Sequence, residues 1–119
     1  MLPSFKLYRP VGQKELELIR KAAFKAFPPR LPEQPFFYPV LNKEYAVQIA
    51  RDWNTKDPNS GYQGYVLEFV IDSSFFVKHK LEPKIVGAKN HQEYWVPSDL
   101  LPELNNHLIR TISIIEKFV

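Results

Sequence analysis

The sequence predicts an α+β fold in which two small packed β-sheets and flanking helices form a single domain over residues 1–119. Helix-type spacing of apolar residues is concentrated in the first half of the chain, and strand-type segments dominate the second half. The expected order β-α-(β)-α-β-β-β-β is typical of an α+β fold. A chain of 119 residues buries roughly two thirds of its unfolded surface, which is enough for one core.

The first elements follow from the spacing of apolar residues. Residues 5–9 alternate between apolar and polar side chains, which predicts a strand, and Pro10 is expected to end it. Apolar residues at three- and four-residue spacing then predict a helix over residues 13–27. Four prolines within residues 28–35 exclude a helix there and indicate an extended loop.

The middle of the chain is expected to carry a second helix. Residues 36–38 are expected to form a short strand, and Asn42 is a suitable N-cap for a helix that follows it. The apolar stripe of this helix consists of Tyr45, Ala46, Ile49, Ala50 and Trp53. Residues 55–64 are rich in turn-forming residues and are expected to form a loop.

The second half is expected to be mostly strands. Residues 65–71 are apolar at nearly every position and rich in β-branched side chains, which predicts a central strand covered on both faces. Residues 75–77 are expected to add a short strand or a turn, and residues 92–96 a further strand that Pro97 ends. Ser98 is expected to cap a short helix that Pro102 interrupts or restarts. Residues 108–115 are expected to close the chain as a strand.

The composition excludes several classes of protein. The chain has no cysteine, so it holds no disulfide framework, thiolate zinc site or cysteine nucleophile. Its three histidines have no metal-ligand spacing, and no metal site is expected. A net charge of +3 is modest, and its basic clusters are typical of a solvated helix face, so nucleic acid is not the expected partner. No secretion signal or membrane-length apolar run is seen, which favours a cytoplasmic protein with no membrane partner.

The densest polar chemistry lies in residues 87–97. Glycine, lysine, asparagine and histidine there precede Glu93, which is followed by Tyr94 and Trp95. The chain has no phosphate-binding glycine loop, no dinucleotide glycine motif and no serine-nucleophile elbow. Those absences exclude the commonest hydrolases and nucleotide-binding folds.

Three segments together resemble the ADP-ribosyltransferase fold, and more closely small bacterial proteins with an EYWVP-type motif. These are Leu7-Tyr8-Arg9, the aromatic segment 36–45, and His91-Gln92-Glu93-Tyr94-Trp95-Val96-Pro97. The resemblance implies NAD as the substrate, with Glu93 as the catalytic residue for ADP-ribosyl transfer or NAD hydrolysis, and Arg9 as the dinucleotide anchor. The dinucleotide-binding residues that it implies are Arg9, Tyr8, Tyr38, Tyr45, His91, Gln92 and Trp95.

The chemistry of these residue types agrees with those roles, and alternatives stay open. A carboxylate stabilises the positive charge that develops when the nicotinamide–ribose bond breaks, and an arginine fork suits phosphate oxygens. Residues 37–42 lack the Ser-Thr-Ser motif of the arginine-first branch, and His91 stands where the family has Gln or Glu. The alternative function is a non-catalytic module that binds a protein partner; a weaker one is nucleic-acid binding through the basic helix. The alternative role for Arg9 is an ion pair with an acidic neighbour, and for Glu93 a bond to a backbone or lysine partner.

Overall fold

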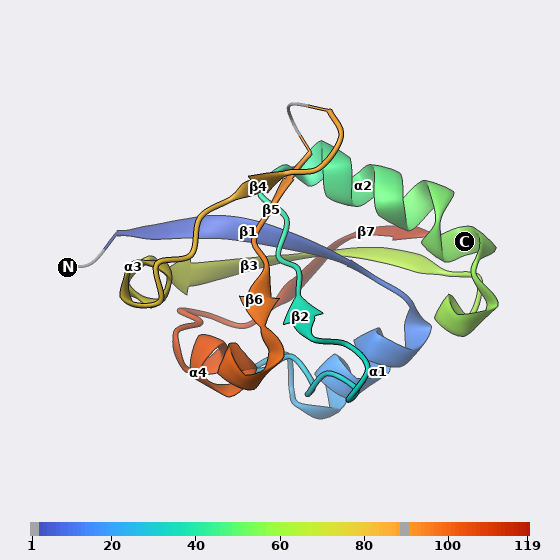
Figure 1. The fold of residues 1–119 in the computed structure, drawn as a ribbon. Coiled ribbons are helices and arrows are strands. Elements are labelled where there is room, and N and C mark those ends of the chain that lie inside the picture. The colour runs from blue at the N-terminus through green and yellow to red at the C-terminus, as the bar shows by residue number, and fades with distance from the viewer. Residues whose placement is uncertain (1–2, 89–90) are drawn as a thin grey trace.

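The computed structural model describes residues 3–88 and 91–119, and its centre is a three-stranded antiparallel sheet (Figure 1). The sheet consists of β1 (Ser4–Val11), β3 (Gly64–Asp72) and β7 (Ser113–Phe118), in the order β1-β3-β7. β1 pairs along its whole length with residues 65–72 of β3, and β7 pairs with the other edge of β3. The prediction of a central strand is therefore confirmed.

The apolar sequence of β3 follows from burial on both faces. Leu67, Phe69 and Ile71 belong to the main core, whereas Val66 belongs to a smaller cluster under a helix. Successive side chains of a strand point to opposite faces. Because both faces are covered, the strand is apolar at consecutive positions.

The helix α2 (Lys43–Asp52) covers one face of the sheet, above it in Figure 1. Asn42 Oδ1 accepts hydrogen bonds from the amides of Glu44 and Tyr45, at 2.8 and 3.3 Å, so the predicted N-cap is confirmed. A Cβ atom at Gly64 would overlap the carbonyl oxygen of Ala50, which shows how closely α2 approaches β3. Trp53 was predicted in the buried stripe of this helix, but 73% of it is exposed because it lies at the C-cap.

The opposite face of the sheet holds the main core. It is closed by α1 (Gln13–Lys21), α3 (Ser74–Lys78) and α4 (Leu101–Asn106). In Figure 1, α1 and α4 lie below the sheet, on the other side from α2. Their buried contributions to the core are Leu16, Ile19, Phe75, Phe76, Leu101 and Leu104. None of the helices in the described parts of the chain has the length and apolar character to cross a membrane.

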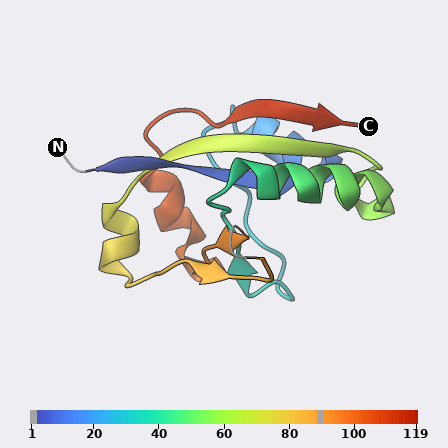
Figure 2. The ribbon, with the colours of Figure 1, turned by 90° about the horizontal axis from the view of Figure 1, so that it is seen from above.

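Four very short strands cross in front of β1 (Figures 1 and 2). β2 (Phe36–Phe37) pairs with β6 (Val96–Pro97), and β4 (Lys84–Ile85) pairs with β5 (Gln92–Glu93). Isolated bridges from Val40 to Tyr8 and to Glu93 join them to β1. The fold class α+β is confirmed, although the described residues form one three-stranded and two two-stranded antiparallel sheets rather than two sheets.

The predicted helix over residues 13–27 is too long. α1 ends at Lys21 because Ala23 and Phe24 adopt left-handed φ values of 56° and 59°. The chain then turns inward, where the amide of Ile112 donates to the carbonyl of Phe24 at 2.7 Å. Phe27 still reaches the main core, but from a loop.

Three boundaries in the second half also differ from expectation. Residues 75–77 lie in helix α3, whose start is stabilised by the Ser74 amide donating to Asp72 Oδ1 at 2.8 Å. The strand expected over residues 92–96 is divided, since β5 and β6 pair with different partners. The last strand begins at Ser113 rather than at residue 108.

The structure also settles the roles of Pro10, Ser98 and Pro102 at the ends of their elements. Pro10 does not end β1, since it pairs with Val66 of β3. On the other edge of β1, the bridge seen in the described residues is at Tyr8, so the missing amide of Pro10 breaks no ladder there. Ser98 lies inside a 3-10 turn, Ser98–Leu100, and makes no cap hydrogen bond. Pro102 lies in the first turn of α4, so it restarts the helix, as one of the two expectations had it.

Candidate functional site

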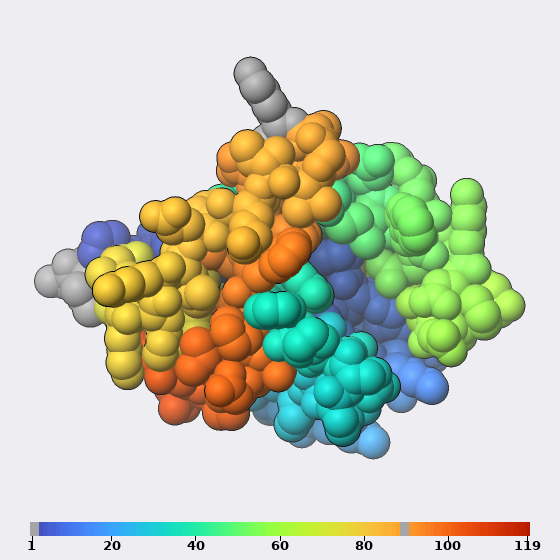
Figure 3. Space-filling model, in the orientation of Figure 1, coloured from blue at the N-terminus to red at the C-terminus, as the bar shows by residue number. Residues whose placement is uncertain are grey.

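Arg9, Tyr38 and Glu93 line one cavity of about 230 Å³, which is called the Glu93 cavity below. Pro10, Val40 and Ile49 complete its lining. The bridges of Val40 to Tyr8 and to Glu93 bring β1, segment 36–41 and β5 together at this point. In Figure 3, blue atoms of the early chain are visible at the floor of a hollow between the teal segment and the green atoms of α2.

The Glu93 carboxylate is oriented by two aromatic side chains. The indole Nε1–H of Trp95 donates to Glu93 Oε1 at 2.9 Å, and the Tyr45 hydroxyl donates to Oε2 at 3.5 Å. Burial, and then the nearby Glu93 carboxylate, raise the pKa of the Tyr45 phenol above its ordinary value. The phenol therefore keeps its proton and remains a donor to Glu93 at neutral pH.

Aromatic rings surround this carboxylate. Trp95 meets Tyr38 edge to face, with ring centroids 6.0 Å apart, and lies 5.8 Å from Phe36. These three residues are called the aromatic wall. The Nζ atom of Lys84 lies 4.8 Å from the centroid of the Trp95 ring. The outer face of the wall thus already accepts a cation.

A second aromatic pair stands beside the wall. The rings of Tyr45 and His91 are stacked, with centroids 4.2 Å apart and planes 7° from parallel. Both residues were predicted to bind a dinucleotide, and the structure places both beside Glu93. Lys89 and Asn90, in the polar stretch singled out in the sequence, lie outside the described residues.

Arg9 is buried, with 7% of its surface exposed. Its Nε and Nη2 atoms donate to the two carboxylate oxygens of Glu15 at 2.5 and 2.7 Å, and its guanidinium carbon lies 4.5 Å from the centroid of the Phe37 ring. Glu15 lies in the first turn of α1, where the helix dipole favours a negative charge. The structure therefore shows Arg9 paired with an acidic neighbour. Arg9 lies inside β1 and not at its last position as predicted, because β1 continues to Val11.

Of the predicted dinucleotide-binding residues, Arg9 and Tyr38 line the Glu93 cavity, whereas Tyr8, Tyr45, His91, Gln92 and Trp95 do not. Tyr8 lies on the opposite face of β1 from Arg9 and packs against the small cluster under α2. Burial and the nearby Glu68 carboxylate raise the pKa of the Tyr8 phenol. Gln92 contributes through its backbone carbonyl, which accepts the amide of Leu41 at 3.0 Å.

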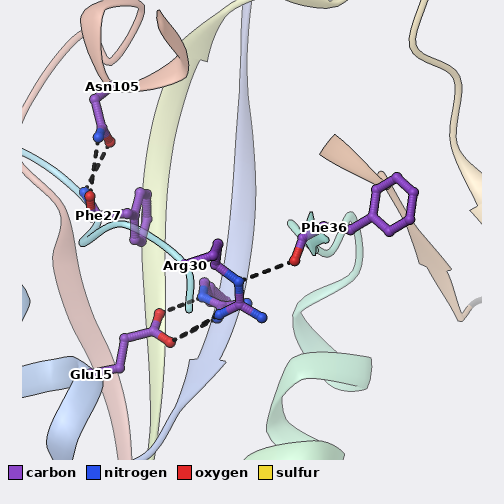
Figure 4. Close-up of polar contacts among 6 residues, drawn as sticks. Glu15, Phe27, Arg30, Phe36 and Asn105 are labelled. Atoms are coloured by element: carbon purple, nitrogen blue, oxygen red, sulfur yellow. Dashed lines mark hydrogen bonds and ion pairs between the residues drawn. The ribbon is translucent and has the colours of Figure 1, made fainter. Parts of the chain in front are cut away.

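Sequence reasoning missed Glu15, Arg30 and Lys84. Arg30 Nη1 lies 3.8 Å from Glu15 Oε1, and its Nε donates to the carbonyl of Phe36 at 3.1 Å (Figure 4). Arg30 stands in a proline-rich loop that has no periodic pattern, so no sequence signal links it to Glu15. An acidic residue in the first turn after a strand-end arginine was a usable signal for Glu15.

The arrangement favours binding of a positively charged group. A carboxylate held by neutral donors and bordered by π faces stabilises a cation both by charge and by ring quadrupoles. Among residues 3–88 and 91–119, no group of three or more histidine, aspartate or glutamate side chains is placed to hold a metal ion. In comparisons with known proteins, the sequence matches no family model and no curated protein.

Proposed function

We propose that the Glu93 cavity binds NAD at its nicotinamide–ribose end and that the protein transfers ADP-ribose or hydrolyses NAD. The observation that supports this proposal is the shared cavity of Arg9, Tyr38 and Glu93, three residues from distant parts of the sequence. The resemblance in the sequence assigns these same residues to one dinucleotide pocket. Their meeting in space is what such a pocket requires.

Glu93 is the proposed catalytic residue. When the bond between nicotinamide and ribose C1′ breaks, its electron pair leaves with nicotinamide and positive charge develops on the ribose. A carboxylate beside C1′ stabilises that charge. The hydrogen bond from Trp95 holds the Glu93 carboxylate in place before the charge develops, which lowers the cost of reorganisation.

The aromatic residues and Arg9 supply binding. The nicotinamide ring of NAD carries a positive charge, so it stacks favourably on Tyr38 or Trp95. Arg9 Nη1 donates to no residue in the described parts of the chain, and it is the guanidinium nitrogen left for a phosphate oxygen. Glu15 fixes the plane of this guanidinium, so the anchor is held in position before NAD binds.

Release of nicotinamide from NAD tests the proposal. We expect Glu93→Gln to lower the release rate roughly 100- to 1,000-fold, because the amide carries no charge to stabilise the ribosyl cation. Glu82→Gln, which alters an exposed glutamate before β4, is the matched control and should turn over like the wild type. Absence of any NAD signal in saturation-transfer NMR at millimolar concentration would remove the basis of the proposal. Equal turnover by wild type and Glu93→Gln would refute the catalytic role and leave NAD binding standing.

A non-catalytic module that binds a protein partner is the second candidate. The exposure of Trp95, at 36%, and the cation–π contact with Lys84 favour it. A lysine or arginine of a partner would take the place of Lys84 on the aromatic wall. In that case a blocked arginine amide, used as a probe, should perturb the Trp95 indole signal in the wild type, and NAD should not.

A further inference from the structure

A second and larger cavity lies on the α1 side of Arg9. Its volume is about 680 Å³, within the range of small-molecule sites, and it is called the Arg30 cavity below. Arg9 lines both this cavity and the Glu93 cavity. The residues of the Arg30 cavity that bear on its chemistry are Arg9, Lys14, Glu15, Arg30, Asn54 and Ser60.

The charges around the Arg30 cavity are unbalanced. Among its described lining residues, Arg9, Lys14 and Arg30 are basic, and Glu15 alone is acidic. Both oxygens of Glu15 are hydrogen-bonded to Arg9. The single negative charge of Glu15, which also lies within ion-pair distance of Arg30, is outnumbered by three basic side chains, so a surplus of positive charge lines the cavity.

Arg30 has the clearest surplus of hydrogen-bond donors in the lining of the Arg30 cavity. Only 14% of its side chain is exposed, and its Nη1 lies 3.8 Å from Glu15 Oε1, too far for a hydrogen bond. Within the described part of the chain, its side chain makes one hydrogen bond, from Nε to Phe36 (Figure 4). Burial, followed by the charge of Arg9, lowers the pKa of Arg30. A largely buried guanidinium with open donors gains strongly from an anionic partner.

A second unsatisfied group lies in the same lining. The Oδ1 atom of Asn54 is buried and accepts no hydrogen bond from any described residue, while its Nδ2 donates to Ser60 Oγ at 3.0 Å. This oxygen has almost no accessible surface, so it does not face the open space of the cavity, and the bond to Ser60 holds the Asn54 side chain in the wall. The contacts that the cavity offers to a ligand are therefore the basic donors of Arg30 and Lys14.

We propose that the Arg30 cavity binds a phosphate monoester, with its phosphate on Arg30 and Lys14. The planar fork of an arginine matches two phosphate oxygens, and the volume of about 680 Å³ leaves room for the organic group of the monoester. α1 also directs the N-terminal end of its dipole toward this cavity, since Gly12 and Lys14 line it. The Arg30 cavity shares Arg9 with the Glu93 cavity, but its phosphate-binding residues Arg30 and Lys14 do not line the Glu93 cavity, and the proposal does not depend on NAD turnover.

Titration calorimetry at constant ionic strength tests the site with three probes: inorganic phosphate, AMP and adenosine. We expect phosphate and AMP to bind, AMP more tightly, and adenosine to give no heat. Arg30→Gln should weaken AMP at least about 10-fold, since a hydrogen bond to a charged group is lost. Lys21→Gln, on the exposed last turn of α1, should bind as the wild type does.

Further variants separate this site from the Glu93 cavity. Glu93→Gln should leave AMP affinity unchanged, whereas a loss comparable to that of Arg30→Gln would place AMP in the Glu93 cavity and overturn the proposal. Arg30→Lys keeps the positive charge without the fork and should bind AMP with intermediate affinity, which guards against a folding defect in Arg30→Gln. Two other results would overturn the proposal. One is that the wild-type protein binds neither phosphate nor AMP at millimolar concentration, and the other is that the wild type and Arg30→Gln bind AMP with equal affinity.

Discussion

Substitution of Glu15 by glutamine tests the energetic importance of the pair with Arg9. The Arg9 and Glu15 side chains are 9% and 21% exposed, and their two hydrogen bonds measure 2.5 and 2.7 Å. Glutamine keeps one acceptor, so one hydrogen bond is lost and the buried cation loses its counter-charge. Loss of one partner of a buried pair costs about 3–5 kcal/mol. Because Glu15 is partly in water, we expect the lower end, about 3 kcal/mol.

Urea unfolding followed by circular dichroism measures this cost. The midpoint of Glu15→Gln should fall while the slope m stays that of the wild type, since the surface exposed on unfolding is unchanged. Glu17→Gln changes an exposed glutamate on the same helix and should remain within about 0.5 kcal/mol of wild type. A Glu15→Gln variant as stable as the Glu17→Gln control would refute the reasoning.

Three further predictions concern packing, capping and pH. Gly64→Ala should cost about 3 kcal/mol in urea unfolding, because its Cβ would overlap the Ala50 carbonyl and force α2 from β3. Asn42→Ala should cost about 1 kcal/mol and Asn42→Asp much less, since aspartate also caps. The hydrogen bond with His79, followed by that with Lys78, lowers the pKa of Glu103 below its ordinary 4.5. Its stabilisation is present above pH 4.5 and lost as the pH falls through the lowered pKa, so the stability gap between wild type and Glu103→Gln should close in acid. If the difference between the urea midpoints of the wild type and Glu103→Gln stays the same from neutral to acid pH, the role of the Glu103 carboxylate in stability is contradicted.

Local patterns in the sequence predicted the elements whose causes are local. β3 was recognisable because burial on both faces requires continuous apolar residues, and α2 because Asn42 caps a periodic segment. The end of α1 was not predictable from spacing. The helix ends where Ala23 and Phe24 adopt left-handed backbone conformations. The Phe24 carbonyl accepts a hydrogen bond from the amide of Ile112, a residue almost ninety positions later in the sequence.

The candidate site shows the same division. The polar stretch with Glu93, and Arg9 directly before Pro10, were visible in the sequence as residue types beside predicted element ends, although β1 continues past Arg9 to Val11. The partner of Arg9 was not, because Glu15 is selected by the angle at which α1 follows β1. Strand propensity predicted one strand through Trp95, whereas pairing with two different strands divides it on either side of Tyr94 and Trp95.

Indole N–H resonances in a ¹H–¹⁵N NMR titration with NAD test the central claim most directly. The chain has two tryptophans: the Trp95 indole donates at 2.9 Å to Glu93, which lines the Glu93 cavity, whereas Trp53 is 73% exposed and lines a different cavity. If NAD occupies the Glu93 cavity, the Trp95 indole signal should shift saturably while that of Trp53 stays in place as an internal reference. A Trp95 signal that does not move at millimolar NAD, or that moves no more than the Trp53 signal, would contradict the account.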